Sequence, residues 1–128
     1  MKVTLTLLLA VWTPIPSVAA DGDVDYARDV KPILRAHCYR CHGVRKQESR
    51  LRLDTGLLAR RGGENGAVLK PGDSAGSRLI ERVTAEDREE RMPPEGAALS
   101  AKEIGVLSRW IDAGAAVPGD EKPEENPL

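Results

Sequence analysis

Aromatic side chains are scarce in this 128-residue chain, which has no phenylalanine, two tyrosines and two tryptophans. One tryptophan, Trp12, lies in an apolar N-terminal run, which leaves Trp110 for the rest of the chain. Aromatic residues usually supply much of the area that a core buries. A small domain with so thin a core is often completed by a disulfide, a metal or a prosthetic group, and two cysteines allow at most one disulfide.

Long apolar runs are also missing. The one candidate, Val3–Trp12, spans about ten residues, half of the roughly 20 that a membrane-crossing helix needs. Lys2 precedes it and small residues ending at Ala20 follow it, which is the arrangement of a secretory signal peptide. We therefore expect residues 1–20 to be a signal peptide, and the rest of the chain to be exported to the periplasm or cell envelope without a membrane span.

An excess of charge of one sign is absent, because the formal net charge is −1. This gives no general reason to expect nucleic acid or an anionic membrane as a partner. The charges are nevertheless unevenly distributed. Residues 40–61 hold seven Lys or Arg against two acids, whereas residues 81–95 hold six acids against three Arg. The chain is dipolar.

The first helix is expected from about Tyr26 to His37, with Asp25 as its cap and apolar residues at helical spacing. Pro32 lies inside this pattern, where it would remove an internal hydrogen bond. The helix should therefore either begin near Val30 or kink.

The last helix has the clearest start, because Ser100 followed by Glu103 forms a capping box. An apolar stripe follows at spacings of three and four, with Trp110 beside it and Gly114 as a stop. The stripe consists of Ile104, Leu107 and Ile111.

The middle of the chain has a less regular sequence pattern. Residues 44–72 look irregular, and a short helix should follow, capped by Asp73 or Ser74. The apolar anchors of the irregular part are Leu51, Leu53, Leu57 and Leu58, and those of the short helix are Leu79, Ile80 and Val83. These elements predict one domain over residues 21–118 and a disordered Pro/Glu-rich tail over residues 119–128.

The most informative motif is Cys38-x-x-Cys41-His42, the pattern of covalent haem c attachment. One helical turn sets the two thiols at the separation of the haem vinyl groups, and the adjacent imidazole points at the iron. The alternatives are disulfide chemistry, because Cys-x-x-Cys is also a redox motif, and half of a zinc site. A helix before the motif disfavours disulfide chemistry. The position of the only other histidine, His37, disfavours a zinc site.

A second axial ligand is expected at Met92, the only methionine after the predicted signal peptide. It lies in a loop stiffened by Pro93 and Pro94, about 50 residues beyond His42. His37 is less suitable, because it shares a helical turn with the attachment site and could not reach the far face of the haem. The alternative for Met92 is ordinary core packing, which its charged surroundings disfavour.

Other candidates are less specific. Trp110 could pack against the haem edge or, as we prefer, within the core against the first helix. A basic set could pair with the haem propionates, dock an acidic partner or, by default, form a solvated surface. The set consists of Arg40, Arg45, Lys46, Arg50 and Arg52.

Six segments carry a resemblance to a known family: Tyr26–Leu34, Cys38–Gly43, Leu51–Asp54, Pro71–Ser74, Arg91–Pro94 and Leu107–Ala115. With them the chain resembles the class I cytochrome c superfamily and, within it, the planctomycete-type cytochrome c domain. The resemblance implies haem attachment at Cys38 and Cys41, His42 as the proximal ligand and Met92 as the distal ligand.

We therefore expect an all-α, cytochrome c-like domain whose first and last helices cross around one covalent haem. Its role would be the transfer of single electrons to and from a redox partner protein, as a monomer or a subunit of a larger complex, and not catalysis. Two alternatives stay open: an open-site haem sensor or peroxidase-like module, and a haem module within a larger redox assembly.

Overall fold

The computed structural model describes residues 23–124, and the regular elements within that range are all helical. A π-helical turn, Tyr26–Val30, leads into α1 (Lys31–His37), and a 3₁₀ turn follows at Glu48–Arg50. The remaining helices are α2 (Gly56–Arg61), α3 (Arg78–Thr84) and α4 (Ala101–Asp112). The expected all-α class is confirmed at this level. The predicted signal peptide, residues 1–20, lies outside the described residues.

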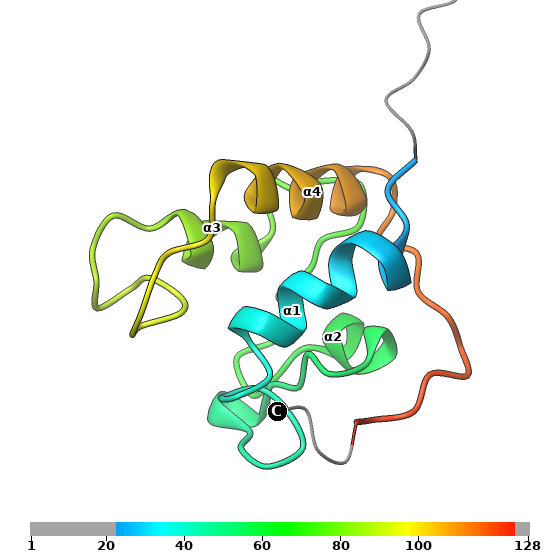
Figure 1. The fold of residues 1–128 in the computed structure, drawn as a ribbon, viewed down its shortest axis with the longest axis horizontal. Coiled ribbons are helices and arrows are strands. Elements are labelled where there is room, and N and C mark those ends of the chain that lie inside the picture. Colours follow the sequence, from blue (N-terminus) through cyan, green and yellow to red (C-terminus); the bar gives the residue numbers. More distant parts are fainter. Residues whose placement is uncertain (1–22, 125–128) are drawn as a thin grey trace, which may run out of the picture.

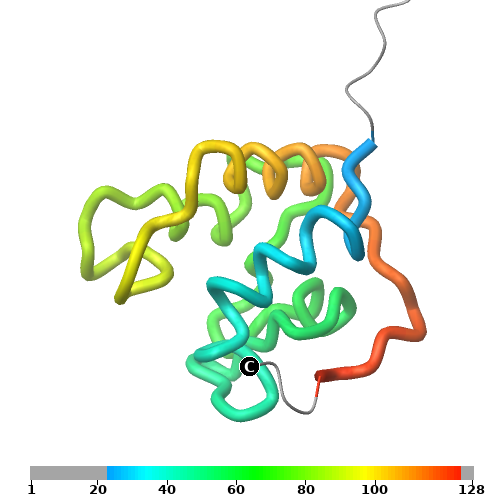
Figure 2. Tube along the Cα trace, in the orientation of Figure 1, coloured from blue at the N-terminus to red at the C-terminus, as the bar shows by residue number. Residues whose placement is uncertain are grey.

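The helices are arranged in Figure 1 with α4 along one side of the molecule, α3 beside it, and α1 running obliquely between α4 and α2. The first helix reaches α4 through its π-helical turn, and α3 also contacts α4. A long loop between α3 and α4, residues 85–100, projects away from the other helices in Figure 2. Within residues 23–124, no helix has the length and apolar character needed to cross a bilayer.

Pro32 explains the unusual start of the first helix. The side chain of Asp25 caps it by accepting from the Arg28 N–H at 2.7 Å. The Lys31 N–H then bonds to the Tyr26 carbonyl, one residue further back than in an α-helix. This wider turn places Pro32 in the first turn of α1, where no N–H is needed. The sequence predicts either a helix that begins near Val30 or a helix with a kink. In the structure a π-helical turn precedes α1, which begins at Lys31.

The core lies where the first helix meets α4. The Tyr26 and Trp110 rings have centroids 5.8 Å apart, and the Trp110 indole N–H donates to the Ala116 carbonyl at 3.0 Å. Val30 and Ile111 are fully buried beside them. The preferred role of Trp110, core packing against the first helix, is confirmed.

The predicted capping box of α4 is present in both directions. The Ser100 hydroxyl accepts from the Glu103 N–H at 3.1 Å, and the Glu103 carboxylate accepts from the Ser100 N–H at 2.8 Å. Beyond the helix, Gly114 adopts a φ of 111°, a left-handed conformation that glycine reaches without strain. The chain turns there, as expected.

Two predictions for the middle of the chain were wrong. Residues 56–61 form α2, with the Thr55 hydroxyl accepting from the Leu58 N–H, and Leu57 is 52% exposed instead of anchoring the core. Helix α3 begins after Ser77, and neither Asp73 nor Ser74 caps it. Those two side chains bind elsewhere: Asp73 accepts from the Gly76 N–H, and Ser74 binds the Asp112 carboxylate.

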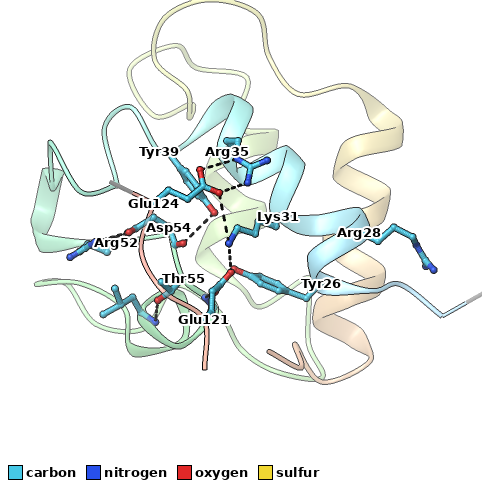
Figure 3. Close-up of polar contacts among 12 residues, drawn as sticks. Tyr26, Arg28, Lys31, Arg35, Tyr39, Arg52, Asp54, Thr55, Glu121 and Glu124 are labelled. Atoms are coloured by element: carbon cyan, nitrogen blue, oxygen red, sulfur yellow. Dashed lines mark hydrogen bonds and ion pairs between the residues drawn. The ribbon is translucent and has the colours of Figure 1, made fainter. Parts of the chain in front are cut away.

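The segment after α4 returns along the first helix and α2, as Figure 3 shows for Glu121 and Glu124. Glu121 accepts from the Tyr26 hydroxyl at 3.0 Å, from the Gly56 N–H at 2.6 Å and from the Lys31 ammonium at 2.6 Å. Glu124 pairs with Arg35. The sequence predicts a disordered tail over residues 119–128, and the described part of it places these carboxylates beside cations and N–H donors of the helices. Residues 125–128 lie outside the described part.

Candidate haem site

One cavity contains all four of the site residues expected from the sequence. Cys38, Cys41 and His42 line it from one side, and Met92 lines it from the loop after α3. The cavity opens to solvent at its mouth. Its other walls are largely apolar and come from three further segments. They include Leu51, Leu53, Val68, Leu79, Val83, Pro93 and Pro94.

The attachment motif forms a turn directly after α1. The Cys38 N–H bonds to the Leu34 carbonyl at 2.8 Å, and the His42 N–H bonds to the Cys38 carbonyl at 2.8 Å. The chain therefore continues to wind past His37, so that both thiols and the imidazole face the same cavity. A side chain at Gly43 would collide with the Tyr39 carbonyl, which explains a glycine immediately after the histidine.

The two cysteines are free thiols. Burial, and next the neighbouring Cys41, raise the pKa of the Cys38 thiol to about 12. A redox-active Cys-x-x-Cys pair uses a thiol whose pKa is lowered instead. Within residues 23–124, no three or more His, Cys, Asp or Glu side chains cluster so as to hold a bare metal ion. The structure thus favours neither the disulfide nor the zinc alternative.

The ring of His42 is oriented by the backbone. Its Nδ1 lies 3.1 Å from the Glu48 carbonyl oxygen, which can only accept, so the proton resides on Nδ1 and the Nε2 lone pair remains for a metal. The loop that supplies this carbonyl is held by two more bonds, from the Gly43 N–H to the Lys46 carbonyl and from the Leu53 N–H to the His42 carbonyl, both at 2.8 Å. The chemistry of this donor fits an iron ligand.

His37 also lines the cavity, but it has a different partner. Its Nε2 lies 3.0 Å from the Glu103 carboxylate at the start of α4. The Ser100 N–H, and after it His37, hold the pKa of Glu103 below its ordinary value. His37 therefore links α1 to α4, which agrees with the expectation that it is not the distal ligand.

Met92 is fastened to the wall of the cavity through its backbone. Its N–H bonds to the Arg82 carbonyl of α3 at 2.9 Å, and the Arg82 guanidinium bonds to the Glu90 carboxylate at 2.7 Å. The side chain is half-buried and stands outside the buried core. Its setting is that of a residue facing a cavity and differs from that of core filler.

The predicted basic set does not reach the cavity. Arg52 pairs with the buried Asp54 at 2.6 Å, and Lys46 pairs with Glu48 at 2.9 Å. None of the set lines the cavity, so pairing of these residues with haem propionates is not supported. Two arginines that the sequence reading missed, Arg78 and Arg82, line it instead. They flank the apolar stripe of α3, and this adjacency was the only signal available.

The family comparison matches this geometry. Residues 38–96 match the family model of planctomycete cytochrome C, a segment that begins at Cys38 and includes Met92. This segment is similar to planctomycete cytochrome C, in agreement with the resemblance seen in the sequence. Comparison with curated proteins and with solved structures gave no match. Similarity to a cytochrome c family points to a haem-binding, electron-transfer role for this segment.

Proposed function

We propose that this cytochrome c domain binds one haem c covalently and transfers single electrons. The observation that carries the proposal is the meeting of two thiols, the His42 imidazole and one thioether in a single, largely apolar cavity. Each of these groups has a distinct role in haem c binding. Thioether bonds at Cys38 and Cys41 would fix the cofactor, His42 would be the proximal ligand, and Met92 the distal ligand.

When bound, the haem iron supplies one-electron exchange between its ferrous and ferric states. The chain's own residues prepare the site for it. The Glu48 carbonyl holds the His42 ring so that Nε2 is free to ligate, and the Arg82 carbonyl holds the backbone of Met92 at the wall formed by the loop after α3. Leucines and prolines around the cavity limit access of water. A low dielectric and a thioether ligand both favour the less charged ferrous state.

The proposal includes the crossing of the first and last helices around the haem, with the Tyr26–Trp110 contact at the crossing. It also includes export to the periplasm or cell envelope, because haem c is attached outside the cytoplasm and residues 1–20 have the pattern of an export signal. The partner would be another redox protein, met by this chain as a monomer or as a subunit of a larger complex.

Covalent attachment is the first test. The chain should be secreted by a host with haem-attachment machinery, and the purified protein should then be denatured and extracted with acidified organic solvent. Haem should remain with the polypeptide, because two thioether bonds hold it. A double variant, Cys38→Ala with Cys41→Ala, is the matched control and should release any haem that it carries. Complete extraction from the wild type would refute the proposal.

A further inference from the structure

The basic side chains that line the cavity differ in whether they bind another group of the protein. Three of them already have protein partners: His37 binds the Glu103 carboxylate, His42 the Glu48 carbonyl, and Arg82 the Glu90 carboxylate. The fourth, Arg78, also lines the cavity. Its guanidinium makes no hydrogen bond or ion pair with any other side chain or backbone group of residues 23–124.

The backbone at Arg78 is nevertheless firmly held. Ser77, immediately before it, is buried, and its hydroxyl accepts from the Lys70 N–H at 2.8 Å and donates to the Asp73 carbonyl at 2.9 Å. Immediately after it, the Leu79 N–H bonds to the Val68 carbonyl at 2.9 Å. The first residue of α3 is thus fixed on both sides, while its charged side chain is exposed at the cavity.

We propose that Arg78 is a positioning residue that binds a propionate carboxylate of the haem. This inference rests on the proposed function. Haem is apolar except for two carboxylates at one edge, and the cavity is largely apolar except for a few groups, among which Arg78 is the uncommitted cation. A guanidinium presents paired N–H donors that match a carboxylate, and a charge-assisted pair of this kind fixes orientation as well as adding affinity.

The neighbouring polar groups favour Arg78 over the other candidates. Arg82 is occupied by Glu90, and the lysine and arginines of positions 40–52 do not line the cavity. The thiols are assigned to the vinyl groups of the cofactor and His42 to its iron, so none of these groups is left for a propionate. Arg78 would therefore bind the carboxylate edge of the haem.

The test is the pH dependence of the reduction potential of the holoprotein. An adjacent cation lowers the pKa of a carboxylate, so in Arg78→Ala the propionate should titrate at higher pH, by about one unit. The potential should also be lower at neutral pH, because the lost positive charge favoured the ferrous state. Arg78→Lys, which keeps the charge, should stay closer to the wild type in potential.

Arg109→Ala is the matched control, because Arg109 is exposed on α4 and does not line the cavity. Its pH profile should follow that of the wild type. If Arg78→Ala keeps its covalent haem but its profile coincides with that of Arg109→Ala, the inference about Arg78 is overturned and the proposed function stands. If the wild type carries no covalent haem, both are overturned.

Discussion

The four residues of the attachment and ligation set have different degrees of structural support. Cys38, Cys41 and His42 are adjacent in sequence and share one turn, whereas Met92 comes from a separate loop. The loop reaches the cavity because the Arg82 carbonyl of α3 accepts from the Met92 N–H. The choice between an electron carrier and an open-site haem protein depends on whether the thioether of Met92 completes the iron coordination.

The variant Met92→Ala should keep its haem, because the thiols and His42 are untouched. Its sixth coordination position should open to water or added ligands, and the reduction potential should fall with the loss of a thioether ligand. The weak red absorption band of a bond between sulfur and ferric iron should be present in the wild type and absent in the variant. Leu57→Ala, at an exposed position outside the cavity, should keep the band.

A wild-type protein that lacks this band and binds carbon monoxide as readily as Met92→Ala would contradict the assignment. Sensing or peroxidase-like chemistry would then be the better interpretation of the site.

Residue-level prediction was possible where chemistry fixes the spacing. Two thiols and an imidazole must stand at set positions to meet a haem, so Cys38-x-x-Cys41-His42 can be read directly. The partner of His42 could not be read, because it is the Glu48 backbone carbonyl, which any residue type would supply. Arg78 was missed for a related reason: nothing local distinguishes it from the other arginines of a chain rich in charge.

Among the elements, the last helix was the most predictable and α2 the least. Helix α4 has a side-chain signature at its start and an apolar stripe over about two turns, both of which are sequence-local. Helix α2 has six residues, too few for a periodic pattern to show. The start of α3 was misplaced because the side chain of Ser74 binds Asp112, 38 positions away, a partner that no local pattern reveals.

The capping box of α4 should give a pH-dependent contribution to stability through Glu103. Its pKa is lowered in the folded chain, first by the Ser100 N–H and then by His37. A carboxyl of this kind stabilises the fold above its unfolded pKa of about 4.5, and the contribution is lost as the pH falls through the lower folded value. Denaturant titrations should therefore show Glu103→Gln less stable than the wild type at pH 7 and equally stable at the lowest pH at which both still fold.

Ser100→Ala is the matched variant at the other half of the capping box. It removes an uncharged acceptor and should cost about 1 kcal/mol at neutral pH. A difference between Glu103→Gln and the wild type that is independent of pH would show that the carboxylate charge does not contribute.

For the molecule as a whole, the returning segment after α4 joins elements that no sequence pattern connects. Glu121 has a side chain only 9% exposed and bonds to Tyr26, Lys31 and the first N–H of α2. The Pro/Glu-rich composition around Glu121 predicts disorder. Composition alone does not show which hydrogen-bond donors are available far away in the chain. The segment links the first helix to α2. These two elements are separate from Met92 and α3, which form walls of the cavity.

Glu121→Ala should destabilise the holoprotein by about 1–3 kcal/mol, because it leaves three donors without their acceptor. Glu124→Ala is the matched control on the same segment. Its carboxylate is 27% exposed and pairs with a more exposed arginine, so its removal should cost less than about 1 kcal/mol. Thermal or denaturant unfolding of the two variants would measure the difference. Equal, small losses would mean that the segment contributes little to the fold.

The turn around His42 has a consequence for the order in which the domain is completed. The bonds that shape residues 38–54 join positions at most fifteen apart, from Tyr39 to Asp54, and the bond from the Met92 N–H to the Arg82 carbonyl is also local but comes later in the chain. Contacts between nearby positions form early, because little chain entropy is lost in closing them. During synthesis and export we therefore expect the thiols to be presented for attachment before the second ligand arrives, so that ligation by Met92 is the closing step of maturation.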